Sequence, residues 1–91
     1  MIKENDIVTF KMTSGDEVVA RLKAQQDNHG YEVTKPHGVM MSQNGFSLIP
    51  WILTIDPDSK VFITWNSVAS VTKTFDRVAK EYVKQTTGLI V

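Results

Sequence analysis

Two strand pairs, one near each end of the chain, constrain the fold more than any other feature of the sequence. The first spans residues 6–24, where two apolar-alternating runs flank the turn signal TSGD at residues 13–16. The second spans residues 60–72, where the polar break TWNS at residues 64–67 separates two short strands. Alternation with a period of two is typical of half-buried strands. This layout predicts a small, strongly bent β-barrel that displays the break residues at one mouth.

The middle of the chain adds further predicted strands. QQDNHG at residues 25–30 is a polar loop, and Asn44-Gly45 marks a hairpin turn between apolar runs. Residues 46–55, FSLIPWILTI, are apolar on both sides, which indicates burial on two faces or an edge that a partner covers. Because Pro50 lacks a backbone N–H, we expect this strand to bend there or to lie at an edge of the sheet.

The hydrophobic period changes near the C-terminus, where we expect an amphipathic helix over about residues 75–87. Apolar residues recur there at helical spacing and form one stripe, Phe75, Val78, Ala79, Tyr82 and Val83. Thr74 is a suitable N-cap, and Gly88 is a suitable stop. We expect the helix to bury this stripe, Phe75 included, where it caps one open end of the barrel.

Composition favours a single globular domain over residues 1–91. Hydrophobic residues make up 42% of the chain and charged residues 22%, and the formal net charge is zero. Zero net charge argues against broad, phosphate-driven nucleic-acid binding. No apolar run approaches the roughly 20 residues of a membrane helix, and the N-terminal MIKENDIV has no apolar signal core. With no cysteine in the chain, the expected location is the cytoplasm of a bacterium or of a phage-infected host.

The chain resembles the Sm/LSm superfamily, including its bacterial Hfq branch, over roughly residues 6–73. VTFKMTSGDEVVARLKA is similar to the first Sm motif, and VFITWNSVASV is similar in layout to the second. The pattern PWIL…PDSKVFI…V..V is similar to that of short Sm-like proteins from tailed phages, cyanophages in particular. The resemblance implies an all-β fold, a small five-stranded, strongly bent barrel to which the C-terminal α-helix is added. It also implies a homo-oligomer, a cyclic ring of about five to seven subunits.

The resemblance further implies RNA binding by loop residues that line the pore of the ring. Carried over by position, the candidate RNA-binding residues are Asn28 and His29 in the first loop and Thr64, Trp65 and Asn66 in the second. Thr64 or Trp65 stands where the family has a basic residue. Trp65 is suited to stack on bases and Asn66 to bond a base edge. The alternatives are that Trp65 packs between subunits and Asn66 closes a turn, while Asn28 and His29 only form a polar loop.

No pattern in the sequence predicts an enzyme, a cofactor or a metal site. His29 and His37 have no further ligand at metal-binding spacing, and Asp56 and Asp58 flank Pro57 in what reads as a turn. A nucleophile–base pair, a glycine-rich phosphate loop and a carboxylate dyad are not discernible. The leading hypothesis is therefore a non-enzymatic, ring-forming RNA-binding protein. The alternative is a phage structural or scaffolding ring that uses the barrel only for oligomerisation.

Overall fold

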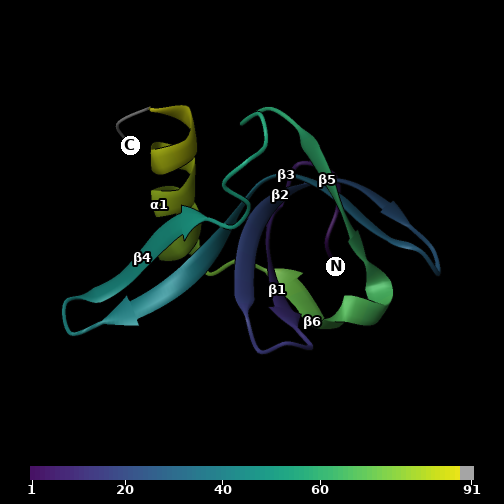
Figure 1. The fold of residues 1–91 in the computed structure, drawn as a ribbon, viewed down its shortest axis with the longest axis horizontal. Helices are drawn as coiled ribbons and strands as arrows, with labels where there is room; N and C mark the ends of the chain where they lie inside the picture. Colours follow the sequence, from purple (N-terminus) through teal and green to yellow (C-terminus); the bar gives the residue numbers. More distant parts are fainter. Residues whose placement is uncertain (89–91) are drawn as a thin grey trace.

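The computed structural model describes residues 1–88 and shows an antiparallel β-fold with one C-terminal helix (Figure 1). Its elements are β1 (Ile7–Met12), β2 (Glu17–Gln26), β3 (Gly30–Ser42), β4 (Gly45–Pro50), β5 (Lys60–Thr64), the 3-10 turn η1 (Trp65–Ser67), β6 (Val68–Lys73) and α1 (Asp76–Thr87). The strands predicted near the start are β1 and β2, which pair with each other, and those predicted near the end are β5 and β6, which pair with β3 and β1 instead. All four strands lie where the period-two alternation placed them.

β3 is the long central strand of the sheet, and it has different partners along its two halves. The strand order is β4-β3-β2-β1-β6, and β5 also pairs with β3. The first half of β3 pairs with β5, and its second half, from His37 onward, pairs with β4. The change of partner occurs around Lys35, whose φ of 50° lies in the left-handed region.

The sheet has six strands, one more than the family resemblance implies. The additional strand is β4, which exists because Asn44-Gly45 folds the extended β3 back on itself. Within residues 1–88, β5 pairs only with β3 and β6 pairs only with β1. The sheet is therefore not closed, and both β5 and β6 are edge strands.

The main core fills the inner side of the bend in the sheet. Its buried side chains are Val8, Phe10, Met12, Val18, Ala20, Leu22, Val33 and Ile63. Phe10 also meets Tyr31 edge to face, with 5.2 Å between the ring centroids. The inward alternation predicted for the first strand pair is thus confirmed. Val68 and Val71 of β6 pack against the same core, so both edge strands contribute to it.

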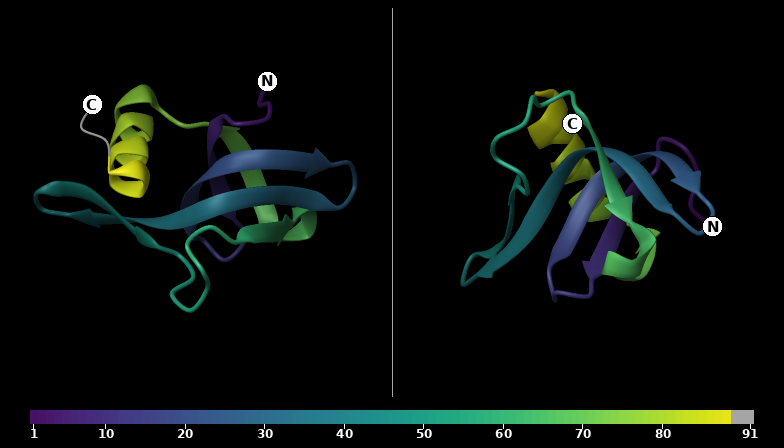
Figure 2. Two further views of the ribbon diagram at one scale, coloured as in Figure 1. Left: turned by 90° about the horizontal axis from the view of Figure 1, so that it is seen from above. Right: turned by 45° about the vertical axis from the view of Figure 1, so that its right-hand side comes forward.

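α1 covers the outer face of the sheet instead of an open end (Figures 1 and 2). Its buried residue Tyr82 packs with Val19 and Leu48, which belong to β2 and β4. The Tyr82 hydroxyl also lies 3.1 Å from the carbonyl of Thr34 and 2.8 Å from that of Lys35. The expected end-cap position is therefore wrong, because the second faces of β2, β3 and β4 are apolar as well and attract the helix.

Phe75 is the clearest departure from the sequence prediction. It occupies the N-cap of α1, with φ −53° and ψ 134°, and its side chain is 69% exposed. The predicted N-cap, Thr74, instead bonds Thr9 through their hydroxyls at 2.8 Å. Because the helix begins one residue later, Phe75 has extended backbone and leaves the stripe formed by Val78, Tyr82 and Val83. The expected burial of Phe75 is therefore wrong.

The predicted strand over residues 46–55 is shorter in the structure. β4 ends at Pro50 and is the outermost strand beside β3, which agrees with the expected edge position of the proline. The following residues, 51–59, form a loop in which Leu53 is 79% exposed. The apolar residues of this loop are not buried on two faces. Several of them, such as Leu53 and Ile55, line a surface groove that is described below.

Candidate functional site

The two predicted RNA-binding loops lie side by side. β3 and β5 are antiparallel, so the start of β3 meets the end of β5, where Gly30 is paired with Thr64. The next residue, Trp65, donates its backbone N–H to the carbonyl of His29 at 2.9 Å. The structure thus brings together two segments that are more than thirty positions apart in the sequence.

Local backbone chemistry explains the shape of the first loop. Asn28 has φ 61°, a left-handed conformation that asparagine tolerates better than most residues. The His29 N–H bonds the Gln26 carbonyl at 3.0 Å, and the His29 Nδ1 lies 2.8 Å from the Asp27 carbonyl. At Gly30 a Cβ atom would collide with the backbone carbonyl of Ile63. Glycine is therefore required where the loop enters β3.

A hollow of about 360 Å³ opens between these loops and is the candidate functional site. Its lining residues are Gln25, Gln26, Asp27, Asn28, Gly30, Tyr31 and Trp65. Trp65, which carries a large apolar indole, is 56% exposed. The hollow, called the loop hollow below, thus combines two aromatic rings, three amide side chains and one carboxylate.

The five predicted site residues do not all line the loop hollow. Asn28 and Trp65 do. The His29 imidazole turns back to its own loop, and the Thr64 hydroxyl lies 3.4 Å from that of Ser67. Asn66 is exposed in η1 next to Trp65 and does not line the hollow.

Three lining residues were missed by the sequence interpretation: Gln25, Gln26 and Tyr31. They flank the polar loop, where β2 ends and β3 begins, and Gln25 is paired with Tyr31. One signal in the sequence could have indicated them, the Gln25-Gln26 pair at the polar end of an otherwise apolar strand. Amides can donate and accept hydrogen bonds, so this set suits a ligand with a mixed polar edge.

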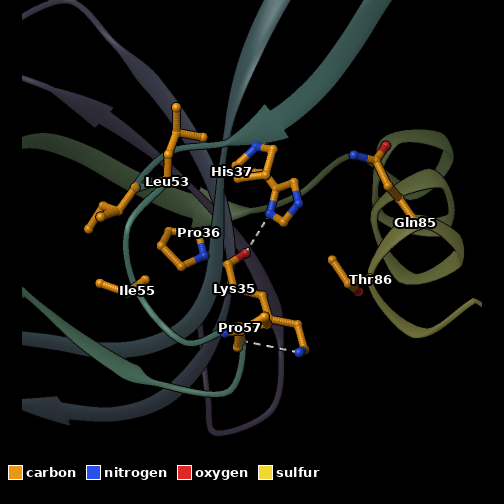
Figure 3. A pocket seen from close by; sticks show the side chains of 10 residues that line it. Lys35, Pro36, His37, Leu53, Ile55, Pro57, Gln85 and Thr86 are labelled. Carbon is orange, nitrogen blue, oxygen red and sulfur yellow. Dashed lines mark hydrogen bonds between the residues drawn. The ribbon is translucent and has the colours of Figure 1, made fainter.

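A second concavity, the apolar groove, lies between β3, the 51–59 loop and the C-terminal half of α1 (Figure 3). It has a volume of about 300 Å³ and is lined by Lys35, Pro36, His37, Pro50, Ile52, Leu53, Ile55, Pro57, Gln85 and Thr86. The Lys35 ammonium at its rim pairs with Asp58 at 3.1 Å. The His37 Nδ1 lies 2.8 Å from the Lys35 carbonyl, as Figure 3 shows. Both polar side chains thus have partners within the same chain.

Other site classes can be described only for residues 1–88. No three His, Cys, Asp or Glu side chains in that range are grouped so that they could hold a metal ion. No helix among these residues has the length and apolarity needed to cross a membrane.

Comparison of the sequence with models of known protein families and with curated proteins gives no match. Function is therefore argued from the two loops, the loop hollow and the open edges of the sheet.

Proposed function

We propose that this protein is an Sm-like, ring-forming protein that binds single-stranded nucleic acid, RNA above all, in the loop hollow. The observation that carries the proposal is the exposed indole of Trp65 beside the amide of Asn28. An exposed aromatic ring next to hydrogen-bonding side chains is the arrangement that recognises unstacked bases.

Assembly into a ring is supported by two of the edge strands, β5 and β6. β5 and β6 each have one partner within residues 1–88, and an unpaired strand edge is a template for pairing with another chain. Pairing of β5 in one copy with β6 in the next is a heterologous contact, which gives a closed ring when the rotation closes. Such pairing also completes each bent sheet into a barrel-like wall. Every subunit would then present one loop hollow, and the repeated sites would add avidity along an RNA strand.

The chemistry of the loop hollow favours contacts with bases over contacts with phosphates. Among the residues that line it, none is lysine or arginine, and Asp27 is acidic. Stacking on Trp65 would supply about 1–3 kcal/mol per base. Since few phosphates are neutralised, the binding constant should depend only weakly on salt concentration.

The test is a titration of short U-rich and A-rich RNAs at two salt concentrations. Trp65→Ala should weaken binding by roughly 5- to 150-fold, which corresponds to the loss of one stacked base. Met40→Ala is the matched control, because Met40 is also about half exposed, at 53%, but lies toward the other end of β3. Its affinity should equal that of the wild type. Unchanged affinity of an intact Trp65→Ala assembly would remove Trp65 from the site.

A second candidate function is a phage structural or scaffolding ring. The absence of lysine and arginine from the lining of the loop hollow favours it. The same titration separates the two functions. An assembled wild-type ring that binds neither RNA at about 50 µM, a concentration typical of weak non-specific nucleic-acid binding, supports scaffolding.

A further inference from the structure

We propose that Phe75 of one copy inserts into the apolar groove of the next copy when β6 of the first pairs with β5 of the second. The inference rests on the ring assembly proposed above and adds the side-chain contact that fixes the register between subunits. Its partner is therefore a second copy of this chain.

Phe75 is placed as a protruding apolar side chain. It follows β6 by two residues, and 69% of its side chain is exposed. Within its own copy it only borders a shallow hollow of about 190 Å³, together with Val39, Val78 and others. Burying a phenylalanine side chain is favourable because it removes apolar area from water, so a surface that covers Phe75 would stabilise the contact between copies.

The apolar groove is the matching concave surface, and it lies just before the other edge strand. Leu53, Ile55 and Pro57 belong to the loop that leads directly into β5. Leu53 and Ile55 are themselves exposed, at 79% and 37%. A groove with exposed aliphatic walls, whose lysine is already paired with Asp58, fits an aromatic side chain better than a charged one.

Antiparallel pairing brings the two features together. All strand pairs in this sheet are antiparallel. When β6 of one copy pairs in this way with β5 of the next, the end of β6 at Lys73 lies toward the start of β5 at Lys60. Phe75 follows β6 by two residues, and the groove-lining loop that contains Pro57 leads into β5. Phe75 and the apolar groove are therefore at the same end of the paired strands.

The two features also lie on the same face of the sheet. Phe75 and Val39 line one hollow, whereas His37 lines the apolar groove. His37 and Val39 are two positions apart on β3 and so point to one face, the face that α1 covers. Pro57 and Ile55 both line the apolar groove in the loop before β5, so both are candidate contacts of Phe75.

The chain has no cysteine, so disulfide trapping tests the contact directly. Copies carrying Phe75→Cys are mixed with copies carrying Pro57→Cys or Ile55→Cys and are then oxidised. We expect covalent dimers with at least one of the two acceptors. Ser14→Cys is the control acceptor, because Ser14 is exposed but lies near the opposite end of β6. It should give no dimer with Phe75→Cys.

The second measurement is the dissociation constant between copies, from sedimentation velocity. Phe75→Ser should raise this constant at least about 10-fold, since buried aromatic anchors dominate interfaces. Met40→Ser, which removes another exposed apolar side chain, should leave it unchanged. The far-ultraviolet circular dichroism of Phe75→Ser should equal that of the wild type, because Phe75 is exposed within one copy.

The outcomes separate this inference from the proposed function. A wild type that stays monomeric at about 100 µM, where even weak complexes associate, overturns the ring and this contact with it. An assembled ring with no dimer to either acceptor, and with unchanged affinity for Phe75→Ser, overturns the contact alone. RNA binding is a separate readout that neither result affects.

Discussion

Gly30 shows how a single residue shapes the candidate site. Its Cα approaches the backbone of β5 so closely that any Cβ would collide with the Ile63 carbonyl. The same close approach allows the Trp65 N–H to reach the His29 carbonyl. The juxtaposition of the two loops, and with it the loop hollow, therefore depends on glycine at this position.

Gly30→Ala should lower the free energy of unfolding by about 1–3 kcal/mol, because the backbone of β3 or β5 must shift. Gly38→Ala is the matched control on the same strand, since a Cβ there would meet its nearest atoms at 3.9 Å, an ordinary contact distance. It should change stability by less than about 1 kcal/mol. Chemical denaturation of both variants measures the difference. Equal losses would show that the close approach at Gly30 is unimportant.

At the scale of elements, α1 holds β3 at the point where β3 changes partners. Tyr82 is fully buried, and its hydroxyl donates to the carbonyls of Thr34 and Lys35. The Gln85 amide donates to the Leu48 carbonyl of β4 at 2.6 Å. Docking of α1 thus fixes the irregular segment around Lys35, and with it one wall of the apolar groove.

The pKa of Tyr82 gives this docking a pH dependence. Burial raises the pKa of its hydroxyl to about 12 from 10.0, against a smaller lowering by Arg21. The folded state therefore holds the proton more tightly than the unfolded state. The resulting stabilisation is complete below pH 10 and is lost as pH rises toward 12, at up to about 1.4 kcal/mol per pH unit.

Tyr82→Phe should remove this pH dependence and should itself cost about 1–3 kcal/mol at neutral pH, because two carbonyls lose their donor. The measurement is the free energy of unfolding of both proteins at pH 9 and pH 11.5. Lysine titration affects both alike, so only the difference between them is interpreted. If wild type and variant lose equal stability over this range, the Tyr82 hydroxyl does not have a raised pKa.

The elements differ in how well the sequence predicts them, for a physical reason. The β1–β2 hairpin and the span of α1 depend on local alternation and turn residues, so they are readable from the chain. Phe75 is not, because its burial depends on whether the helix starts at residue 75 or 76. The irregularity at Lys35 depends on Tyr82, 47 positions away, which no local pattern encodes.

The candidate site was predictable only in part, because it depends on contacts between segments that are distant in the sequence. Asn28 and Trp65 came from the family resemblance, which supplies a non-local pairing that periodicity cannot. Gln25, Gln26 and Tyr31 were missed because the β2–β3 register contains two irregularities. Such shifts depend on tertiary packing, so the side chains that reach the loop hollow follow only from the folded structure.

At the scale of the whole molecule, the open sheet bears on the proposed assembly and the neutral charge on the proposed RNA binding. In the proposed ring a second copy pairs with the open edges of β5 and β6, and with zero net charge base contacts would be the main source of RNA affinity. The central claim is accordingly that assembly and RNA binding occur in one ring.

Sedimentation velocity of the protein with a fluorescently labelled U-rich RNA, followed at the wavelength of the label, tests that claim most directly. A single subunit has a mass of 10.2 kDa. We expect the label to sediment with one species of about five to seven subunits, the ring size that the resemblance to the Sm/LSm superfamily implies. A protein that sediments at 10.2 kDa while the label sediments as free RNA would contradict the account.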